Sequence, residues 1–152
     1  MDLSSFTVTQ GGNIPQQHTC DGGDRSPPFA WMGVPDRTAS FALICDDPDA
    51  PSGTWDHWVI YNLSTAMREL QAGIAAVETL PNGARQGKNS SGTIGYRGPC
   101  PPRGAPHRYF FRLYALDTML DVPPGASKSE VLDAAQGHIL GQAELMGRYA
   151  RA

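Results

Sequence analysis

The sequence lacks the features that mark several large classes of protein. Its 12 basic residues do not exceed its 15 acidic ones, which argues against a nucleic-acid-binding surface or a polybasic membrane anchor. No apolar run approaches the roughly 20 residues of a membrane-spanning helix. The first residues, MDLSSFTVTQGG, have neither the basic start nor the apolar centre of a secretory signal. We therefore expect a cytoplasmic protein without a membrane span or a nucleic-acid partner.

Cysteine is also scarce, and its spacing is informative. The chain has three cysteines, Cys20, Cys45 and Cys100, with no Cys-x-x-Cys pair among them. Disulfide frameworks and structural zinc sites normally show an even number of cysteines or closely spaced pairs. The sequence therefore predicts three reduced thiols. A Gly-x-Ser-x-Gly elbow and a P-loop are absent as well, so two common signatures of hydrolases are missing.

Glycine and proline, by contrast, are abundant. The chain has 17 glycines and 13 prolines in 152 residues, which favours strands and turns over long helices. Its length suits one domain with its own core, residues 1–152. Apolar runs predict strands over residues 40–45, 57–63 and 107–117, and alternation at residues 6–8 predicts a first strand. Residues 66–71 are expected to form a short helix.

The C-terminal segment carries the strongest helical pattern. A Ser-x-x-Glu capping box begins at Ser127. Apolar residues then recur every four positions, at Val131, Ala135, Ile139 and Ala143. The pattern predicts one amphipathic helix from the capping box to Met146. The expected fold class is therefore mainly β, with antiparallel sheets and a C-terminal α-helix.

The acidic stretch DDPD raises the question of a metal site. A calcium-binding EF-hand loop that began at Asp47 would place Trp58 at its twelfth position, where a glutamate is needed. A transition metal held by Asp47, His57 and His107 has no local spacing to fix its geometry. We therefore expect no metal. Asp46 is interpreted as part of a surface turn.

Polar ring residues at the starts of two strands indicate a pocket instead. Side chains two positions apart share a face of a strand, so His57 is expected on the face of Val59 and opposite Trp58. His107 and Tyr109 likewise share a face. A lone histidine in such a place is usually a core residue with a satisfied hydrogen bond, but two of them after Gly/Pro-rich loops favour a pocket. With the Tyr109 hydroxyl and backbone amides of the loop YRGPCPPRG, they would offer donors to a small anion.

Four motifs carry a resemblance to a known family. They are Asp47-Pro-Asp-Ala-Pro51, Trp55-x-His57, Tyr96-x-Gly98-Pro-Cys-Pro-Pro102 and His107-Arg-Tyr109. Together they closely resemble the phosphatidylethanolamine-binding proteins (PEBP), also called Raf kinase inhibitor-like proteins, in their shorter prokaryotic branch. The resemblance covers essentially the whole chain. It implies a β-sandwich of two antiparallel sheets with a pocket for phosphate-like anions and phospholipid head groups.

The resemblance also implies which residues form that pocket. The expected ligand-binding residues are Asp47, Pro51, Trp55, His57, Gly98, Pro99, Cys100, His107 and Tyr109. Cys100 is the thiol expected to touch the ligand. Asp49 and Arg108 are expected to support the site, and the Ala50–Pro51 peptide bond to be cis. Asp56, which stands where many eukaryotic members have a second histidine, and the pair Ser90-Ser91 leave the ligand preference open.

We therefore expect a non-enzymatic protein that binds a small anion or a phosphorylated ligand, with no cofactor and no catalytic residue. The resemblance adds a protein partner, such as a kinase or a protease, and allows a homodimer. Two alternatives remain open. One is a hydrolase that uses His57 or His107 beside Asp47, and the other is a protease or kinase inhibitor that acts through a surface away from the pocket. The other histidines, His18 and His138, are expected to be structural, the second within the C-terminal helix.

Overall fold

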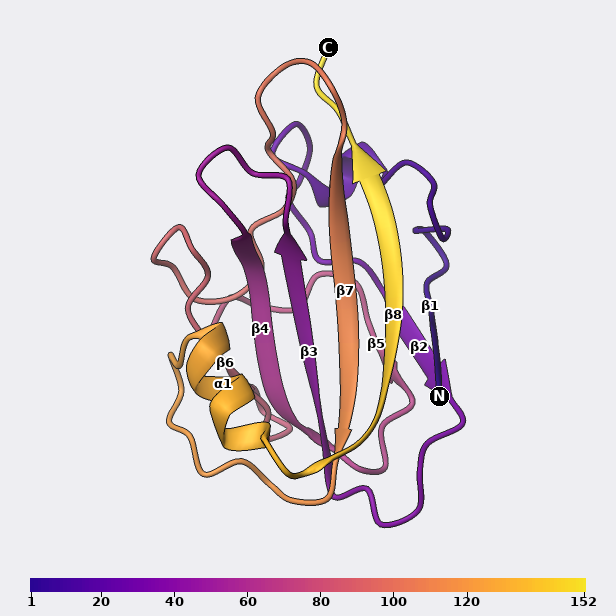
Figure 1. The fold of residues 1–152 in the computed structure, drawn as a ribbon, viewed down its shortest axis with the longest axis vertical. Coiled ribbons are helices and arrows are strands. Elements are labelled where there is room, and N and C mark those ends of the chain that lie inside the picture. Colours follow the sequence, from indigo (N-terminus) through magenta and orange to yellow (C-terminus); the bar gives the residue numbers. More distant parts are fainter.

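The computed structural model describes residues 1–152 and contains two antiparallel sheets and one short helix (Figure 1). The larger sheet has the strand order β6-β4-β3-β7-β8, and the smaller has the order β1-β2-β5. The strands of the larger sheet are β3 (Ser40–Asp47), β4 (Trp55–Ser64), β6 (Arg85–Gln86), β7 (His107–Leu116) and β8 (Ile139–Tyr149). Those of the smaller sheet are β1 (Asp2–Ser4), β2 (Phe29–Met32) and β5 (Glu69–Leu70). The mainly β, antiparallel fold predicted from the sequence is confirmed.

The main core lies between the two sheets. It is a cluster of 21 buried residues that joins Phe29 of the smaller sheet to Leu43, Trp58 and Phe111 of the larger one. A second cluster of 10 residues covers the opposite face of the larger sheet, where the helix α1 (Lys128–Ala135) packs. Every residue of β3 is therefore buried. This explains the continuous apolar run SFALIC, because a strand covered on both faces need not alternate.

The prediction of a long C-terminal helix is only half right. Helix α1 begins with the expected capping box but ends at Ala135. Gly137 then adopts a φ of 83°, and the chain continues as β8, which pairs with β7 along its length. A spacing of four residues fits a strand as well as a helix, because four is a multiple of the strand period of two. His138 consequently lies outside the helix, with its Nδ1 2.7 Å from Asp117.

Three smaller local predictions are also wrong. Residues 6–8 form no strand, because the Ser5 hydroxyl accepts hydrogen bonds from the backbone N–H groups of Thr7 and Val8 and makes a turn. Phe6 is consequently 92% exposed. Residues 66–71 form no helix, because β5 pairs with β2 there. The Ala50–Pro51 peptide bond is trans, as are all others. None of the helices is long and apolar enough to cross a membrane.

Candidate functional site

A pocket of about 490 Å³ opens at the end of the larger sheet where β3 ends and β4 and β7 begin. One side of it, the strand wall, consists of Asp47, Trp55, His57, His107 and Tyr109. The other side, the loop wall, comes from residues 20–24, 50–52 and 91–102. All the residues that the family resemblance assigned to a ligand line this pocket except Pro99. Pro99 is not among the lining residues, and its carbonyl accepts from the N–H of Cys20 at 3.1 Å.

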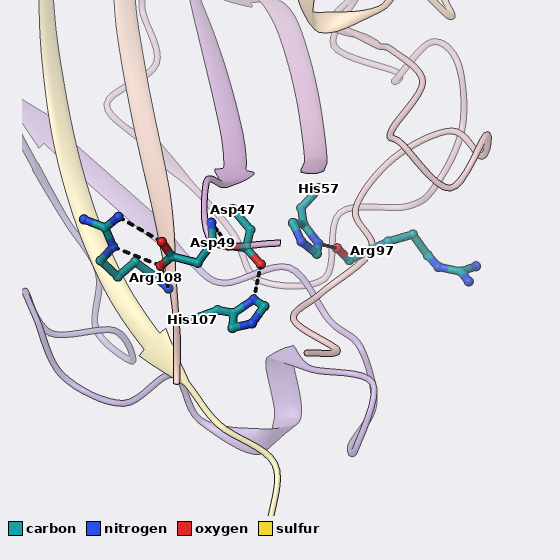
Figure 2. A network of polar contacts seen from close by, with 6 residues as sticks. All are labelled: Asp47, Asp49, His57, Arg97, His107 and Arg108. Atoms are coloured by element: carbon teal, nitrogen blue, oxygen red, sulfur yellow. Dashed lines mark hydrogen bonds and ion pairs between the residues drawn. The ribbon is translucent and has the colours of Figure 1, made fainter. Parts of the chain in front are cut away.

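Asp47 fixes the orientation of His107 and is itself held by the backbone (Figure 2). Its Oδ2 lies 2.7 Å from Nδ1 of His107, and its Oδ1 accepts from the N–H of Asp49 at 2.7 Å. Because a carboxylate can only accept, Nδ1 of His107 carries a proton. Nε2 of His107 is left free to contact a molecule in the pocket. The other nitrogen of the same ring bonds the negatively charged Asp47.

Asp49 supports the loop next to the pocket. Its carboxylate accepts two hydrogen bonds from the guanidinium of Arg108 and one from the Arg108 backbone N–H, each at 2.9 Å. The bonds from the Arg108 side chain are the main cause that lowers the pKa of Asp49 to about 2. The pair joins the loop after β3 to the start of β7 (Figure 2). Neither residue lines the pocket, so their role here is support.

His57 reaches the pocket because β4 contains a bulge. Consecutive residues of β3 pair with Trp58 and Asp56, which leaves His57 as an extra residue in its strand. The ring of His57 stands edge-on to Tyr109, with ring centroids 5.3 Å apart. His57 therefore lies on the face of Trp58. The prediction that it shares the face of Val59 is wrong, because strict alternation fails across a bulge.

The ring of His57 has a neutral partner and little contact with water. Its Nδ1 donates to the backbone carbonyl of Arg97 at 2.5 Å (Figure 2). Because a carbonyl can only accept, Nδ1 carries the proton, and no hydrogen bond within the protein uses Nε2. The residue is 6% exposed. Burial lowers the pKa of His57 from its ordinary value, against the opposing effects of the Arg97 carbonyl and the negative charge of Asp47. The ring is therefore neutral at about pH 7.

The hydroxyl of Tyr109 is buried in the strand wall and has no hydrogen-bond partner in the protein. Burial, and secondly the negative charge of Asp47, raise the pKa of this phenol far above its usual range. Tyr109 therefore keeps its proton and can donate. Buried polar groups in proteins are seldom left unpaired, so this covered hydroxyl, which lies in the wall of the pocket close to Asp47, keeps an unused hydrogen-bond donor.

A disulfide between Cys20 and Cys100, with Cα atoms 5.4 Å apart, closes the loop wall. The prediction of reduced thiols at these two positions, and of Cys100 as a thiol that touches the ligand, is therefore wrong. The two cysteines are 80 residues apart in the sequence, so no local spacing signals their bond. Cys45 is the one free cysteine. Burial raises the pKa of Cys45 well above its usual value, which makes it an unreactive core residue.

Gly98 brings the loop wall against the short 3-10 turn at Gln16–His18. Its N–H donates to Oδ1 of Asp24 at 2.9 Å, and a Cβ at this position would lie 2.0 Å from the carbonyl oxygen of His18. Any larger residue would force the two segments apart. Because Asp24 already accepts from this N–H, Gly98 does not offer the free backbone donor that the sequence predicted for an anion.

His18 lies beneath this contact and is structural, as expected. Its Nδ1 donates to the carbonyl of Arg25, and its Nε2 bonds the hydroxyl of Thr7, both at 2.8 Å. Both ring nitrogens are therefore used within the fold, in contrast to those of the two pocket histidines.

Comparison with known proteins identifies the fold and its family. A sequence model described as Phosphatidylethanolamine-binding protein matches residues 4–150. The chain belongs to the phosphatidylethanolamine-binding protein family. It is 56% identical over 151 residues to a UPF0098 protein of Methanothermobacter thermautotrophicus, covering 99% of both chains. To a UPF0098 protein of Aquifex aeolicus it is 47% identical over 153 residues, covering 99% of this chain and 89% of that one.

Two solved structures of PEBP relatives share the fold over nearly the whole chain. The PEBP homologue CT736 of Chlamydia trachomatis superposes with a TM-score of 0.90 at 41% identity, covering 99% of this chain and 97% of that one. E. coli YbcL, described as a new member of the mammalian PEBP family, superposes with a TM-score of 0.91 at 33% identity, covering 99% and 98%. The β-sandwich implied by the sequence motifs is thus the observed fold.

Several residues of this PEBP pocket were not among the predicted ligand residues. They are Cys20, Asp24, Ala50, Ser52, Ser91, Arg97, Pro101 and Pro102. Asp24 meets Gly98 across 74 residues of sequence, and no spacing rule signals such a contact. Ala50, Pro101 and Pro102 lie inside the family motifs. They can be found from the sequence if every residue of a motif is taken as a candidate for the pocket.

Two aspartates close to the pocket in sequence face the other side of the sheet. Asp46 is buried and pairs with Arg112 and Lys128, each at 2.9 Å, so its interpretation as a surface turn is wrong. Asp56 pairs with Lys128 at 3.1 Å and does not line the pocket. It therefore adds no acceptor to the pocket of this PEBP, and these ion pairs instead tie the start of α1 to the larger sheet.

Proposed function

We propose that this chain is a non-enzymatic binding protein whose pocket holds a small anion, either the phosphate of a phospholipid head group or that of another phosphorylated ligand. Membership of the PEBP family supports a binding protein of this fold. We propose further that residues 1–152 act as a single domain, with Asp47, His57, His107 and Tyr109 as the polar side of the site.

One observation carries this proposal. Three polar atoms without a hydrogen-bond partner in the protein belong to one pocket, namely Nε2 of His57, Nε2 of His107 and the hydroxyl of Tyr109. A protonated His107 between Asp47 and a bound anion would donate from Nε2, and Tyr109 would donate a second hydrogen bond. In this proposal Asp47 orients His107, while Pro51, Trp55, Gly98 and Cys100 shape the surrounding walls.

Isothermal titration calorimetry with phosphate and phosphoethanolamine tests the proposal. We expect saturable heat with at least one of them and the loss of most of the affinity in His107→Ala. His138→Ala is a matched control, because His138 also bonds an aspartate at 2.7 Å but lies outside the pocket. This variant should bind as the wild type does. Wild-type protein that gives no saturable heat with either compound would contradict the proposal.

A hydrolase is the second candidate, favoured by the 2.7 Å contact between Asp47 and His107. A carboxylate that orients an imidazole is a common arrangement around a general base. Cys100 cannot act as a nucleophile within its disulfide, so the attacking group would be water or the hydroxyl of Ser52 or Ser91. Turnover of a phosphoester panel that is lost in His107→Ala would favour this candidate. Rates equal to those in buffer alone would favour the binding protein.

The protein partner and the homodimer in our proposal rest on the resemblance to the family alone. Kinase and protease inhibition assays with wild type and His107→Ala separate two routes of action. Inhibition lost in the variant indicates action through the pocket, whereas inhibition retained indicates another surface. Sedimentation over a range of protein concentrations tests the homodimer.

A cytoplasmic location is part of the proposal, and the disulfide provides its test. Thiols in the cytoplasm are generally kept reduced, so the bond between Cys20 and Cys100 reports on the surroundings of the protein. Alkylation in intact cells, followed by mass analysis, should label both cysteines if the location is cytoplasmic. A pair protected from alkylation would instead indicate an oxidising compartment.

A further inference from the structure

The two pocket histidines have the same tautomer but different partners. Nδ1 of His57 donates to the carbonyl of Arg97, and Nδ1 of His107 donates to the carboxylate of Asp47. Each ring therefore presents Nε2 as its remaining polar atom. The partner of His107 is negatively charged, whereas the partner of His57 is neutral.

His57 is placed to accept a hydrogen bond rather than to donate one. It is buried, and burial is the main cause that lowers its pKa from the ordinary value. The charged or titratable groups around it are three aspartates, a tyrosine and two basic residues of the pocket, namely Asp24, Asp46, Asp47, Tyr109, Arg97 and His107. In the neutral ring Nδ1 holds the only proton, so Nε2 offers a lone pair.

A bare oxyanion and a bare nitrogen lone pair repel each other. A fully deprotonated anion in this pocket would receive bonds from His107 and Tyr109 but would set one oxygen against Nε2 of His57. An anion that still carries an O–H would donate that proton to Nε2 and satisfy both groups.

We propose that His57 selects oxyanions that retain a proton, so that the pocket prefers hydrogen phosphate or a singly protonated phosphomonoester over sulfate. This inference rests on the proposed function, since it assumes that an anion occupies this pocket. It narrows that function to phosphate and its monoesters, because the phosphodiester of an intact phospholipid head group carries no O–H, and it names a specificity-determining residue. The rival acceptor is Asp24, whose Oδ1 is used by Gly98 but whose Oδ2 makes no hydrogen bond within the protein.

Calorimetry with a series of tetrahedral anions at about pH 7 tests this inference on the wild-type protein. Phosphate retains a proton at this pH, whereas sulfate and monofluorophosphate, which have nearly the same shape, do not. We expect phosphate to bind at least about tenfold more tightly than either, the effect of one hydrogen bond. Methyl phosphate, with a second pKa of about 6, has largely lost its O–H at this pH and should therefore bind more weakly than phosphate.

Variants assign the selection to one residue. His57→Gln replaces the acceptor with an amide that can also donate, so the ratio of phosphate to sulfate affinity should fall to near one. Asp24→Asn and Asp47→Asn are the controls, since each keeps an oxygen acceptor for its present backbone donor. They should change the affinity for both anions but keep the ratio.

Each other outcome overturns a defined part of the inference. Equal binding of phosphate and sulfate by the wild type removes the selection but leaves the proposed function intact. If the ratio of phosphate to sulfate affinity is unchanged in His57→Gln, or is lost in Asp24→Asn, the selection cannot be assigned to His57. Failure of every anion to bind contradicts the proposed function itself. If His57→Gln does not fold, the wild-type series still decides whether the retained proton matters.

Discussion

The two walls of the pocket are held in place by different kinds of contact. The strand wall belongs to β3, β4 and β7, which are neighbours in the larger sheet and pair over most of their lengths. The loop wall depends on a few isolated contacts, chiefly the disulfide and the bond from Gly98 to Asp24. The three polar atoms to which we assign the anion are on the strand wall. We therefore expect changes in the loop wall to alter stability and changes in the strand wall to alter binding.

The largest effect is expected from removal of the disulfide by Cys20→Ser together with Cys100→Ser. The bond closes a loop with a sequence separation of 80 residues, and the loss of such a constraint on the unfolded chain costs on the order of 4 kcal/mol. Urea unfolding of the double variant and of the oxidised wild type measures the difference. Equal unfolding midpoints would show that the loop wall does not depend on the bond.

Gly98→Ala should have the next largest effect. Its Cβ would meet the His18 carbonyl oxygen at 2.0 Å and Oδ1 of Asp24 at 2.6 Å, so the backbone has to shift, at about 2 kcal/mol. Gly23→Ala, in a loop close by, is the matched control, because its Cβ would have no neighbour nearer than 3.7 Å. Thermal unfolding compares them, and a similar melting temperature for the two variants would contradict the packing argument.

The same contrast explains what the sequence could and could not predict. His107 and Tyr109 were placed correctly on one face, because strand periodicity is a local property. Cys20 and Asp24 were missed, because their partners lie 80 and 74 residues away and only the folded chain brings them together.

Local patterns also misled where they were ambiguous. The apolar spacing of four after Ala135 fits both a helix and a strand, and the pairing of β8 with β7 decides it. The bulge at His57 reverses the face predicted for that one residue. The family motifs nevertheless contain most of the residues that line the pocket.

On the strand wall, Asp47→Asn should lower the affinity for phosphate roughly tenfold, as is usual when the partner of a ligand-binding histidine is altered. The amide oxygen can still accept from the Asp49 N–H, and only the bond to His107 is altered, so the loss of stability should be smaller than in Gly98→Ala. Asp117→Asn, which alters the partner of His138 outside the pocket, is the control. Calorimetry and thermal unfolding measure both properties, and unchanged affinity would show that Asp47 does not act through His107.

The smallest effect is expected for Asp49→Asn, because its ion pair with Arg108 lies outside the pocket and is partly exposed to solvent, which weakens the attraction. The folded protein holds the pKa of Asp49 at about 2, below its ordinary value of 3.8. A carboxylate with a depressed pKa stabilises the fold fully above its unfolded pKa and loses this contribution as the pH falls through its folded pKa. Urea midpoints of variant and wild type should therefore differ slightly at neutral pH and converge as the pH falls from about 4 to about 2. A difference that stays constant over this range would mean that Asp49 supports the loop through hydrogen bonds that do not depend on its charge.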